Sequence, residues 1–366
     1  MQENKKTDNL FLVSCTLFMI ILVAFCGLRI LGGLGFYNKM PDWFADVFFT
    51  VTAQIGLMVL VPIIGMYIYK KRAVPEMSFN EFVMYGSDSQ KHVKTTLREW
   101  GFRKPSSDIL FWSIVLGVLC FLFNLFVASA FNGILAMLGH RGAMGGAGGD
   151  PIFAGLYGLV IMLILSAVLP GICEEVTHRG MLMEGFRRRL GIQKAMLLSS
   201  LLFGFMHLNI VQFFYATILG YIMAVAVVAM RNIWPAIIIH FMNNALSTYL
   251  VFAHRNDWIG GNFFTWFGNF VGFNIIFYFV CFAGLYFIII GILHKFARQN
   301  FIEKYRNSET PPRLFRGSGM SAIKYYISYG EQIDKTPLRP IERAMVSGIV
   351  FLGAVITIMT FAWGML

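Results

Sequence analysis

Long apolar runs recur along the whole chain and constrain its fold more than any other feature. About 20 consecutive apolar residues are enough for a helix to cross a hydrocarbon core about 30 Å thick. Nine such runs are present, one of them short. Backbone groups in lipid must form hydrogen bonds within the protein, which a helix achieves along its own length. The sequence therefore predicts an all-α, polytopic membrane helix bundle with eight to nine transmembrane helices. The runs lie near 10–31, 47–69, 109–131, 152–186, 195–210, 213–230, 234–252, 264–293 and 344–365.

The composition excludes an ordinary soluble domain. Of the 366 residues, 57% are hydrophobic and only 13% are charged, whereas soluble domains carry about 25% charged residues. A soluble core could not bury this much apolar surface, so lipid must be the solvent for most of it. The five cysteines lie in or beside apolar runs without C-x-x-C spacing, which argues against a disulfide framework and a zinc knuckle.

The net charge of +11 is distributed as in a membrane protein. Most of the 30 lysines and arginines fall on one predicted face, and Lys39, Arg141 and Arg255 fall on the other. The positive-inside rule then places the N-terminus in the cytoplasm. We expect an integral, multi-pass protein of a bacterial cell membrane whose basic face meets an anionic lipid surface. No nucleic-acid-binding motif accompanies the charge, so no nucleic-acid partner is expected.

The apolar runs and the loops divide the chain into three predicted parts. Residues 1–150 hold the N-terminal membrane helices and a cytoplasmic amphipathic loop at 70–108. Residues 151–252 form a membrane core, and 253–366 hold the C-terminal helices with a cytoplasmic insertion at 294–343.

Three connecting segments allow more than one interpretation. The stretch KHVKTTLREWGFRKP at 91–105 is typical of an interfacial amphipathic helix. The glycine-rich stretch at 139–149 favours a flexible linker over a phosphate-binding loop, because no Lys-Ser/Thr pair follows it. The insertion at 294–343 favours a connector, with a docking site for a partner as the alternative.

The stretch GICEEVTHRG brings ionisable groups to the end of a long apolar run. An ionised group in lipid costs about 2.5–3.5 kcal/mol, so such residues default to a functional hypothesis. Glu175 and Arg179 are four residues apart, the spacing of an ion pair on one helix face. Pro170 and Gly171 predict a kink just before Glu174.

Two further polar clusters follow within apolar runs. The stretch FGFMH contains Phe203 and His207, and HFMNN contains His240 and Asn244, each pair four residues apart. A histidine or asparagine in a membrane often only bonds a neighbouring helix, and that is the alternative for each residue taken singly. Phe203 is expected to pack rather than to take part in chemistry.

Depth in the membrane favours a shared site for these clusters. Glu174 precedes the basic loop 187–194 by 13 residues and His207 follows it by 13, so both lie about 20 Å along their helices from that loop. His240 lies nine residues beyond Arg231, about 14 Å in. Three helices thus present a carboxylate and two imidazoles at comparable depth.

This set of side chains fits two hydrolytic mechanisms. Glu174, His207 and His240 are a ligand set for catalytic zinc, with a fourth position left for water. Without metal, Glu174 serves as the base, His207 polarises the water, and His240 with Asn244 donates to the oxyanion. The sequence does not choose between them. His178, four residues after Glu174, is a less favoured further ligand.

The motifs together resemble a known family. EExxxR, FxxxH and HxxxN, in this order on successive membrane helices over about 150–250, resemble the CPBP family of CAAX-processing and bacteriocin-associated intramembrane proteases. The resemblance implies an all-helical protease core in which Glu174, His207 and His240 are essential, with Asn244 assisting and Glu175 alongside. The family commonly carries an aromatic residue at the position of His178, which puts the local packing in question.

The combined interpretation is an intramembrane endopeptidase that cleaves a peptide or membrane-protein substrate. The first alternative is a non-proteolytic scaffold, immunity or regulatory protein on the same fold. The second, a transporter with Glu174 as a proton relay, is weaker because no inverted repeat is visible.

Overall fold

A computed structural model describes residues 9–84, 96–140, 155–273, 275–334 and 336–365. These residues form helices and connecting segments, and no strand occurs among them. Eight helical stretches within them are long and apolar enough to cross a membrane, which confirms the all-α polytopic bundle and an integral, multi-pass membrane protein. They are Leu10–Gly33, Asp42–Arg72, Ser107–Met137, Gly155–Leu190, Ile210–Met230, Trp234–Arg255, Ile275–Lys304 and Pro340–Ala362.

Two of these stretches, Asp42–Arg72 and Gly155–Leu190, combine α-helical and π-helical segments. The elements up to the fourth stretch are α1 (Leu10–Gly33), η1 (Phe36–Lys39), α2 (Asp42–Val51), η2 (Thr52–Leu60), α3 (Val61–Ala73), α4 (Phe79–Met84), α5 (Thr96–Glu99) and α6 (Ser107–Met137). The fourth stretch comprises α7 (Gly155–Leu163), η4 (Ile164–Val168), α8 (Leu169–Glu175), η5 (Val176–Leu182) and α9 (Met183–Leu190). The rest are α10 (Ile192–Met206), α11 (Ile210–Met230), α12 (Trp234–Arg255), α13 (Phe263–Phe273), α14 (Ile275–Lys304), α15 (Gly319–Ser328) and α16 (Pro340–Met365).

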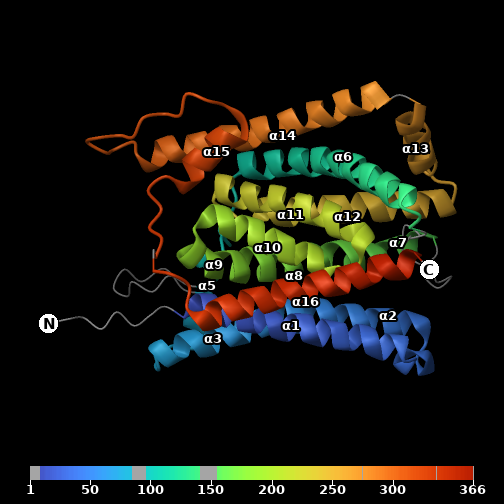
Figure 1. Cartoon of the computed structure of the whole chain (residues 1–366), viewed down its shortest axis with the longest axis horizontal. Coiled ribbons are helices and arrows are strands. Elements are labelled where there is room, and N and C mark those ends of the chain that lie inside the picture. Colours follow the sequence, from blue (N-terminus) through green and yellow to red (C-terminus); the bar gives the residue numbers. More distant parts are fainter. Residues whose placement is uncertain (1–8, 85–95, 141–154, 274, 335, 366) are drawn as a thin grey trace.

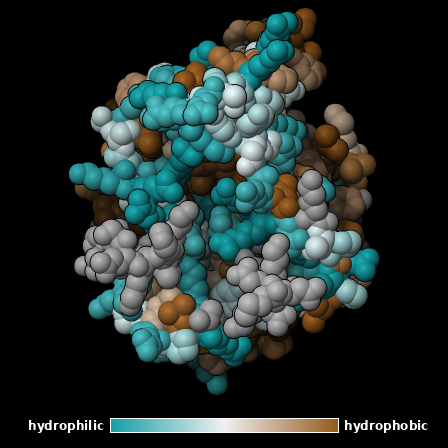
Figure 2. All heavy atoms as spheres, turned by 90° about the vertical axis from the view of Figure 1, so that its left-hand side faces the viewer, coloured by the Kyte–Doolittle hydropathy of each residue, from teal (hydrophilic) through white to brown (hydrophobic). Residues whose placement is uncertain are grey.

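The long helices run side by side, and the connecting segments gather at the two ends of the bundle (Figure 1). The start of α1 lies at one end with α5, α9 and α15, while α7, α13 and the end of α16 lie at the other. Figure 2 looks onto the first end and shows mostly hydrophilic residues there. The described parts of the loops that are predicted to be cytoplasmic therefore share one end of the molecule. Which side of the membrane this end faces stays a prediction.

The predicted single segment at 264–293 is wrong. The structure has two helices there, α13 and α14. At 1.5 Å per residue the 11 residues of α13 reach only about 16 Å, so α14 supplies the membrane span. Hydropathy does not mark this break because the chain is equally apolar on both sides of it. The helix α14 also continues to Lys304 and takes up the start of the predicted insertion at 294–343.

The predicted amphipathic helix at 91–105 is also wrong over the part that the structure describes, 96–105. Helix there is limited to the four residues of α5. Gly101 ends it with a φ of +87°, and the ring of Trp100 turns inward against Gly180, leaving 4% of Trp100 exposed. The tryptophan therefore packs on the bundle rather than at the lipid surface. The rest of this stretch, and most of the glycine-rich stretch at 139–149, lie outside the described residues.

The helix α10 is the short member of the predicted set. Its 15 residues reach about 22 Å, and the chain turns back into α11 through His207, Leu208 and Asn209. Backbone groups at membrane depth need partners inside the protein. The side chain of Asn209 accepts a hydrogen bond from the Val211 amide at 2.8 Å, and the Ile210 amide donates to Thr360 Oγ1 at 3.0 Å. The turn that carries His207 is thus held by α11 and α16.

The other end of α10 is fixed by the segment that follows α15. Both carboxylate oxygens of Glu331 accept from the Ile192 amide at the start of α10, at 2.9 and 3.0 Å. Arg189, just before this start, forms ion pairs with Asp334 and with Glu342, the latter at 2.9 Å. Part of the 294–343 insertion therefore packs on the helices of its own chain, as a connector would. A partner at this insertion stays a prediction.

Candidate active site

Glu174 and Glu175 lie side by side in sequence but in different environments. They end α8, which has the π-helical segment η4 before it and η5 after it. Such segments are rare and occur frequently at functional sites. The side chain of Glu174 is 15% exposed, whereas that of Glu175 is fully buried. Only Glu174 is therefore open to a water molecule or a substrate.

Glu175 is held by the predicted ion pair with Arg179. The Nη1 atom of Arg179 donates to Glu175 Oε1 at 2.8 Å, and both side chains are fully buried, which confirms this prediction. The Nη2 atom donates to the carbonyl oxygen of Gly220 at 2.9 Å. A Cβ atom on Gly220 would lie 3.1 Å from this Nη2, so glycine provides the room for the contact.

His240 connects the two glutamates. Its Nδ1 atom lies 2.9 Å from Glu175 Oε1, and its Nε2 atom lies 4.0 Å from Glu174 Oε2. Because the ionised carboxylate of Glu175 only accepts, Nδ1 of His240 must carry the hydrogen. When the ring is neutral, the lone pair of Nε2 then lies toward Glu174. A carboxylate that orients a histidine in this way is common where the other ring nitrogen binds a metal or acts on water.

His207 is oriented by its own helix. Its Nδ1 atom donates to the carbonyl oxygen of Phe203 at 2.9 Å, which leaves Nε2 as the acceptor in the neutral ring. The ring of Phe203 packs edge-to-face against His207 at 5.1 Å and against His240 at 5.5 Å between centroids. The Arg179 guanidinium lies 4.6 Å from the same ring. Phe203 therefore packs at the centre of the site.

The donor set of this site decides how well it fits a metal ion. The free Nε2 atoms of His207 and His240 suit a metal or a water equally well. Within the described part of the chain, however, no group of three or more His, Cys, Asp and Glu side chains is arranged to hold a metal ion. No catalytic step is therefore derived through zinc, and zinc on Glu174, His207 and His240 stays a prediction.

Asn244 takes part in a contact that its predicted role did not include. Its Nδ2 atom donates to the carbonyl oxygen of Ser166 at 2.9 Å. In an α-helix that carbonyl would accept from residue 170, which is a proline without an N–H group. Asn244 thus satisfies a carbonyl that Pro170 leaves free. Its second amide hydrogen has no acceptor among the described residues, so the predicted donation to an oxyanion remains available.

A second proline is compensated in the same way. Pro62 in α3 cannot donate to the carbonyl of Met58, and Thr177 Oγ1 donates to this carbonyl at 2.6 Å. Membrane helices tolerate proline where a neighbouring helix satisfies the freed group. The contact also joins η2 to η5 directly beside the two glutamates.

His178 fills the position where the CPBP family commonly has an aromatic residue. Its ring is fully buried and packs edge-on against Phe203 at 5.1 Å and Phe18 at 5.8 Å. Its Nδ1 atom donates to the backbone carbonyl of Glu174 at 2.8 Å, and Nε2 has no hydrogen-bond partner. The imidazole thus packs as an aromatic ring does, which answers the question that this departure raised.

Gln54 is a residue of the site that the sequence did not predict. This residue lies in η2, and its Nε2 atom donates to Glu174 Oε1 at 2.8 Å. The only signal was a lone glutamine inside the apolar run 47–69, and no spacing rule connects it to a residue 120 positions later.

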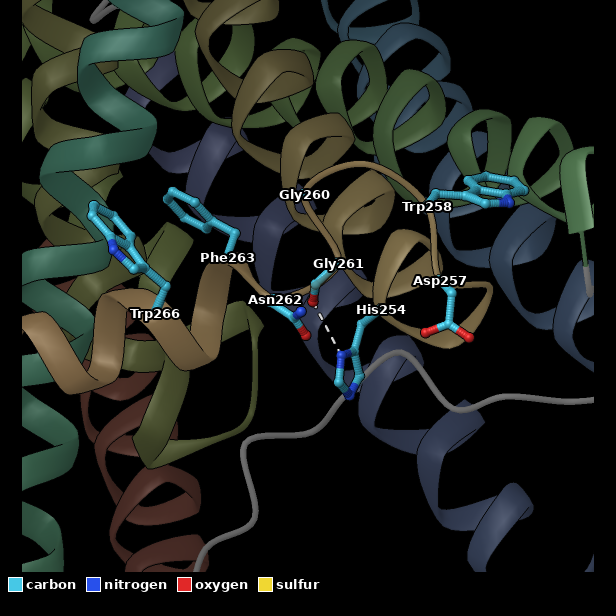
Figure 3. A pocket seen from close by; sticks show the side chains of 8 residues that line it. All are labelled: His254, Asp257, Trp258, Gly260, Gly261, Asn262, Phe263 and Trp266. Carbon is cyan, nitrogen blue, oxygen red and sulfur yellow. Dashed lines mark hydrogen bonds between the residues drawn. The ribbon is translucent and has the colours of Figure 1, made fainter.

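A cavity of about 550 Å³ lies away from this site, at the end of α12 (Figure 3). The ring of His254 donates there to the Gly261 carbonyl at 3.0 Å. None of the candidate catalytic residues lines this cavity. Its lining residues are His254, Asp257, Trp258, Gly260, Gly261, Asn262, Phe263 and Trp266.

One comparison with known proteins matches the region of the chain that holds these side chains. The family model described as "Type II CAAX prenyl endopeptidase Rce1-like" matches residues 155–246, which include every motif residue of the site. Residues 155–246 resemble an Rce1-like protease. The CPBP resemblance is thereby confirmed for this segment, about a quarter of the chain, and it supports a CAAX-type intramembrane protease in general. Comparisons with curated proteins and with solved structures found no match.

Proposed function

We propose that the protein is an intramembrane endopeptidase in which Glu174 activates a water molecule. The observation that carries the proposal is the pairing of Glu174 Oε2 with the Nε2 atom of His240 at 4.0 Å. A water about 2.8 Å from both atoms would subtend an angle of about 90° at its oxygen, close to the geometry of two donated hydrogen bonds. The partial exposure of Glu174 allows such a water to enter.

The reaction needs only groups present at the site. Glu174 takes one proton from the water, whose oxygen bonds to the carbonyl carbon of the peptide. The carbonyl oxygen becomes an oxyanion, toward which the second amide hydrogen of Asn244 is available. The C–N bond then breaks, and Glu174 returns the proton to the leaving amine. His240 accepts the second hydrogen of the water at its Nε2 atom, and Glu175 keeps His240 in the required tautomer. His207 completes the polar lining of the site.

The substrate class and the membrane sidedness are part of the proposal. The matched family's name describes CAAX prenyl endopeptidases, so a prenylated C-terminal peptide is the first substrate to test. We place the N-terminus and the basic end of the bundle in the cytoplasm of a bacterium, following the positive-inside rule. The substrate then reaches the site from the cytoplasmic half of the bilayer.

Cleavage assays on purified variants test this function. Glu174→Gln, His207→Ala and His240→Ala should each lose cleavage of prenylated and plain membrane peptides while remaining folded. Chelation separates the two mechanisms: loss of wild-type activity and its return with zinc would support the zinc prediction, while unchanged activity would support the metal-free mechanism. Full cleavage by Glu174→Gln would refute the site and favour the scaffold alternative.

A further inference from the structure

We propose that Gln54 is a positioning residue that fixes the orientation of the Glu174 carboxylate. The inference rests on the proposed function, in which Glu174 is the catalytic base. Gln54 lies in η2, more than 100 residues before the segment that matches the protease family. Its Nε2 atom donates to Glu174 Oε1 at 2.8 Å, the distance of a charge-assisted hydrogen bond.

Glu174 is the one partner that the structure gives to the Gln54 side chain among the described residues. The Oε1 atom of Gln54 is buried and has no donor. Polar groups inside a membrane span are expensive, and a glutamine in the span Asp42–Arg72 needs compensation or a function. The hydrogen bond to Glu174 compensates the amide of Gln54 and also gives it a function. The amide orientation follows, because the opposite orientation would place two acceptor oxygens against each other.

The hydrogen bond leaves the correct oxygen of Glu174 free. With Oε1 occupied by Gln54, Oε2 is the oxygen that faces His240 Nε2. The two histidines follow the same rule, since each has Nδ1 held by an acceptor and Nε2 left for the reaction. Gln54 thus orients the carboxylate of Glu174, as Glu175 orients the ring of His240.

The backbone around Gln54 is itself fixed. Thr177, three residues after Glu174, donates to the carbonyl of Met58 at the far end of η2. The donor segment is therefore tied to the helix that carries its acceptor, at two points about one turn apart. A side chain on such a support loses little conformational freedom when it forms the contact, as a precise positioning role requires.

The activity test compares Gln54→Met with Thr52→Val. Methionine has nearly the volume of glutamine but no donor, and should lower kcat about 10- to 100-fold with KM nearly unchanged. Thr52→Val removes a hydroxyl from the same π-helical segment, at a residue with no hydrogen bond to the site among the described residues, and should keep the wild-type kcat. A wild-type kcat in Gln54→Met, or an equal loss in Thr52→Val, would overturn the proposal.

A stability test without substrate keeps the proposal separate from the proposed function. Thermal unfolding in detergent is measured for Gln54→Met, Glu174→Met and the double variant. If the two side chains are bonded, the double variant should lose less stability than the two single losses added together. Additive losses would overturn the contact, whether or not the protein is a protease. Coupled losses in a protein without cleavage activity would refute the proposed function and leave the contact intact.

Discussion

The replacement Arg179→Met measures how much the bundle depends on its buried ion pair. The guanidinium is fully buried and donates to Glu175 at 2.8 Å and to the Gly220 carbonyl at 2.9 Å. Methionine keeps most of the aliphatic volume but leaves Glu175 as a buried charge with only His240 beside it. Removing one partner of a buried pair costs about 3–5 kcal/mol. Folded proteins are stable by only about 5–15 kcal/mol, so the loss should be large.

The assay compares thermal unfolding and folded yield in detergent with those of Arg187→Met. Arg187 undergoes the same substitution on the same continuous helix, but its side chain is 50% exposed and its ion pairs with Glu184 and Glu331 measure 3.5 and 3.4 Å. Exposed pairs contribute about 0–1 kcal/mol, so this control should unfold close to the wild type. Equal stability of the two variants would refute the reasoning. A stable Arg179→Met protein without activity would instead indicate that Arg179 serves the site by holding Glu175 against His240.

Three further predictions concern packing and topology. His178→Phe should keep folded yield and cleavage, because the imidazole packs as an aromatic ring and its Nε2 has no hydrogen-bond partner among the described residues. Loss of activity in this variant would show that the imidazole nitrogen takes part in the function. Thr177→Val should lower stability by about 1–3 kcal/mol in thermal unfolding by leaving the Met58 carbonyl unpaired, and an unchanged unfolding temperature would contradict this. In intact cells a membrane-impermeant maleimide should label Ile259→Cys, in an exposed position beside α13, but not Ser308→Cys; the reverse pattern would invert the topology.

The features that the sequence predicts well depend on one helix at a time. Apolar run length identifies the membrane helices because the bilayer sets a minimum length for each. The pair of Glu175 and Arg179 follows from their spacing of four residues. Residue counts from one loop predict equal depth for Glu174 and His207. This depth stays a prediction, because the count assumes an α-helical rise throughout while the π-helical η5 lies between Glu174 and the loop. No information about other helices is needed for any of these.

The features that the sequence does not predict depend on contacts between distant helices. The bond from Gln54 to Glu174 joins residues 120 positions apart, and no periodicity relates them. Trp100 looks like an interfacial residue among lysines and arginines, yet its ring packs against Gly180, which has no side chain to exclude it. The break between α13 and α14 lies in an apolar run that could have continued. Tertiary packing decides all three cases.

In the proposed mechanism the two adjacent glutamates cannot exchange roles, and the reason is the direction in which each one points. Successive residues of a helix project about 100° apart, so Glu174 and Glu175 meet different neighbours. Glu175 faces Arg179 and the Nδ1 of His240 in a fully buried position, where a carboxylate is stable only because it is paired. A group held in this way is closed to water and serves to orient the histidine. Glu174 meets one amide donor from Gln54 and keeps its other oxygen accessible, which is the arrangement a base needs when it must take a proton from water and later return it.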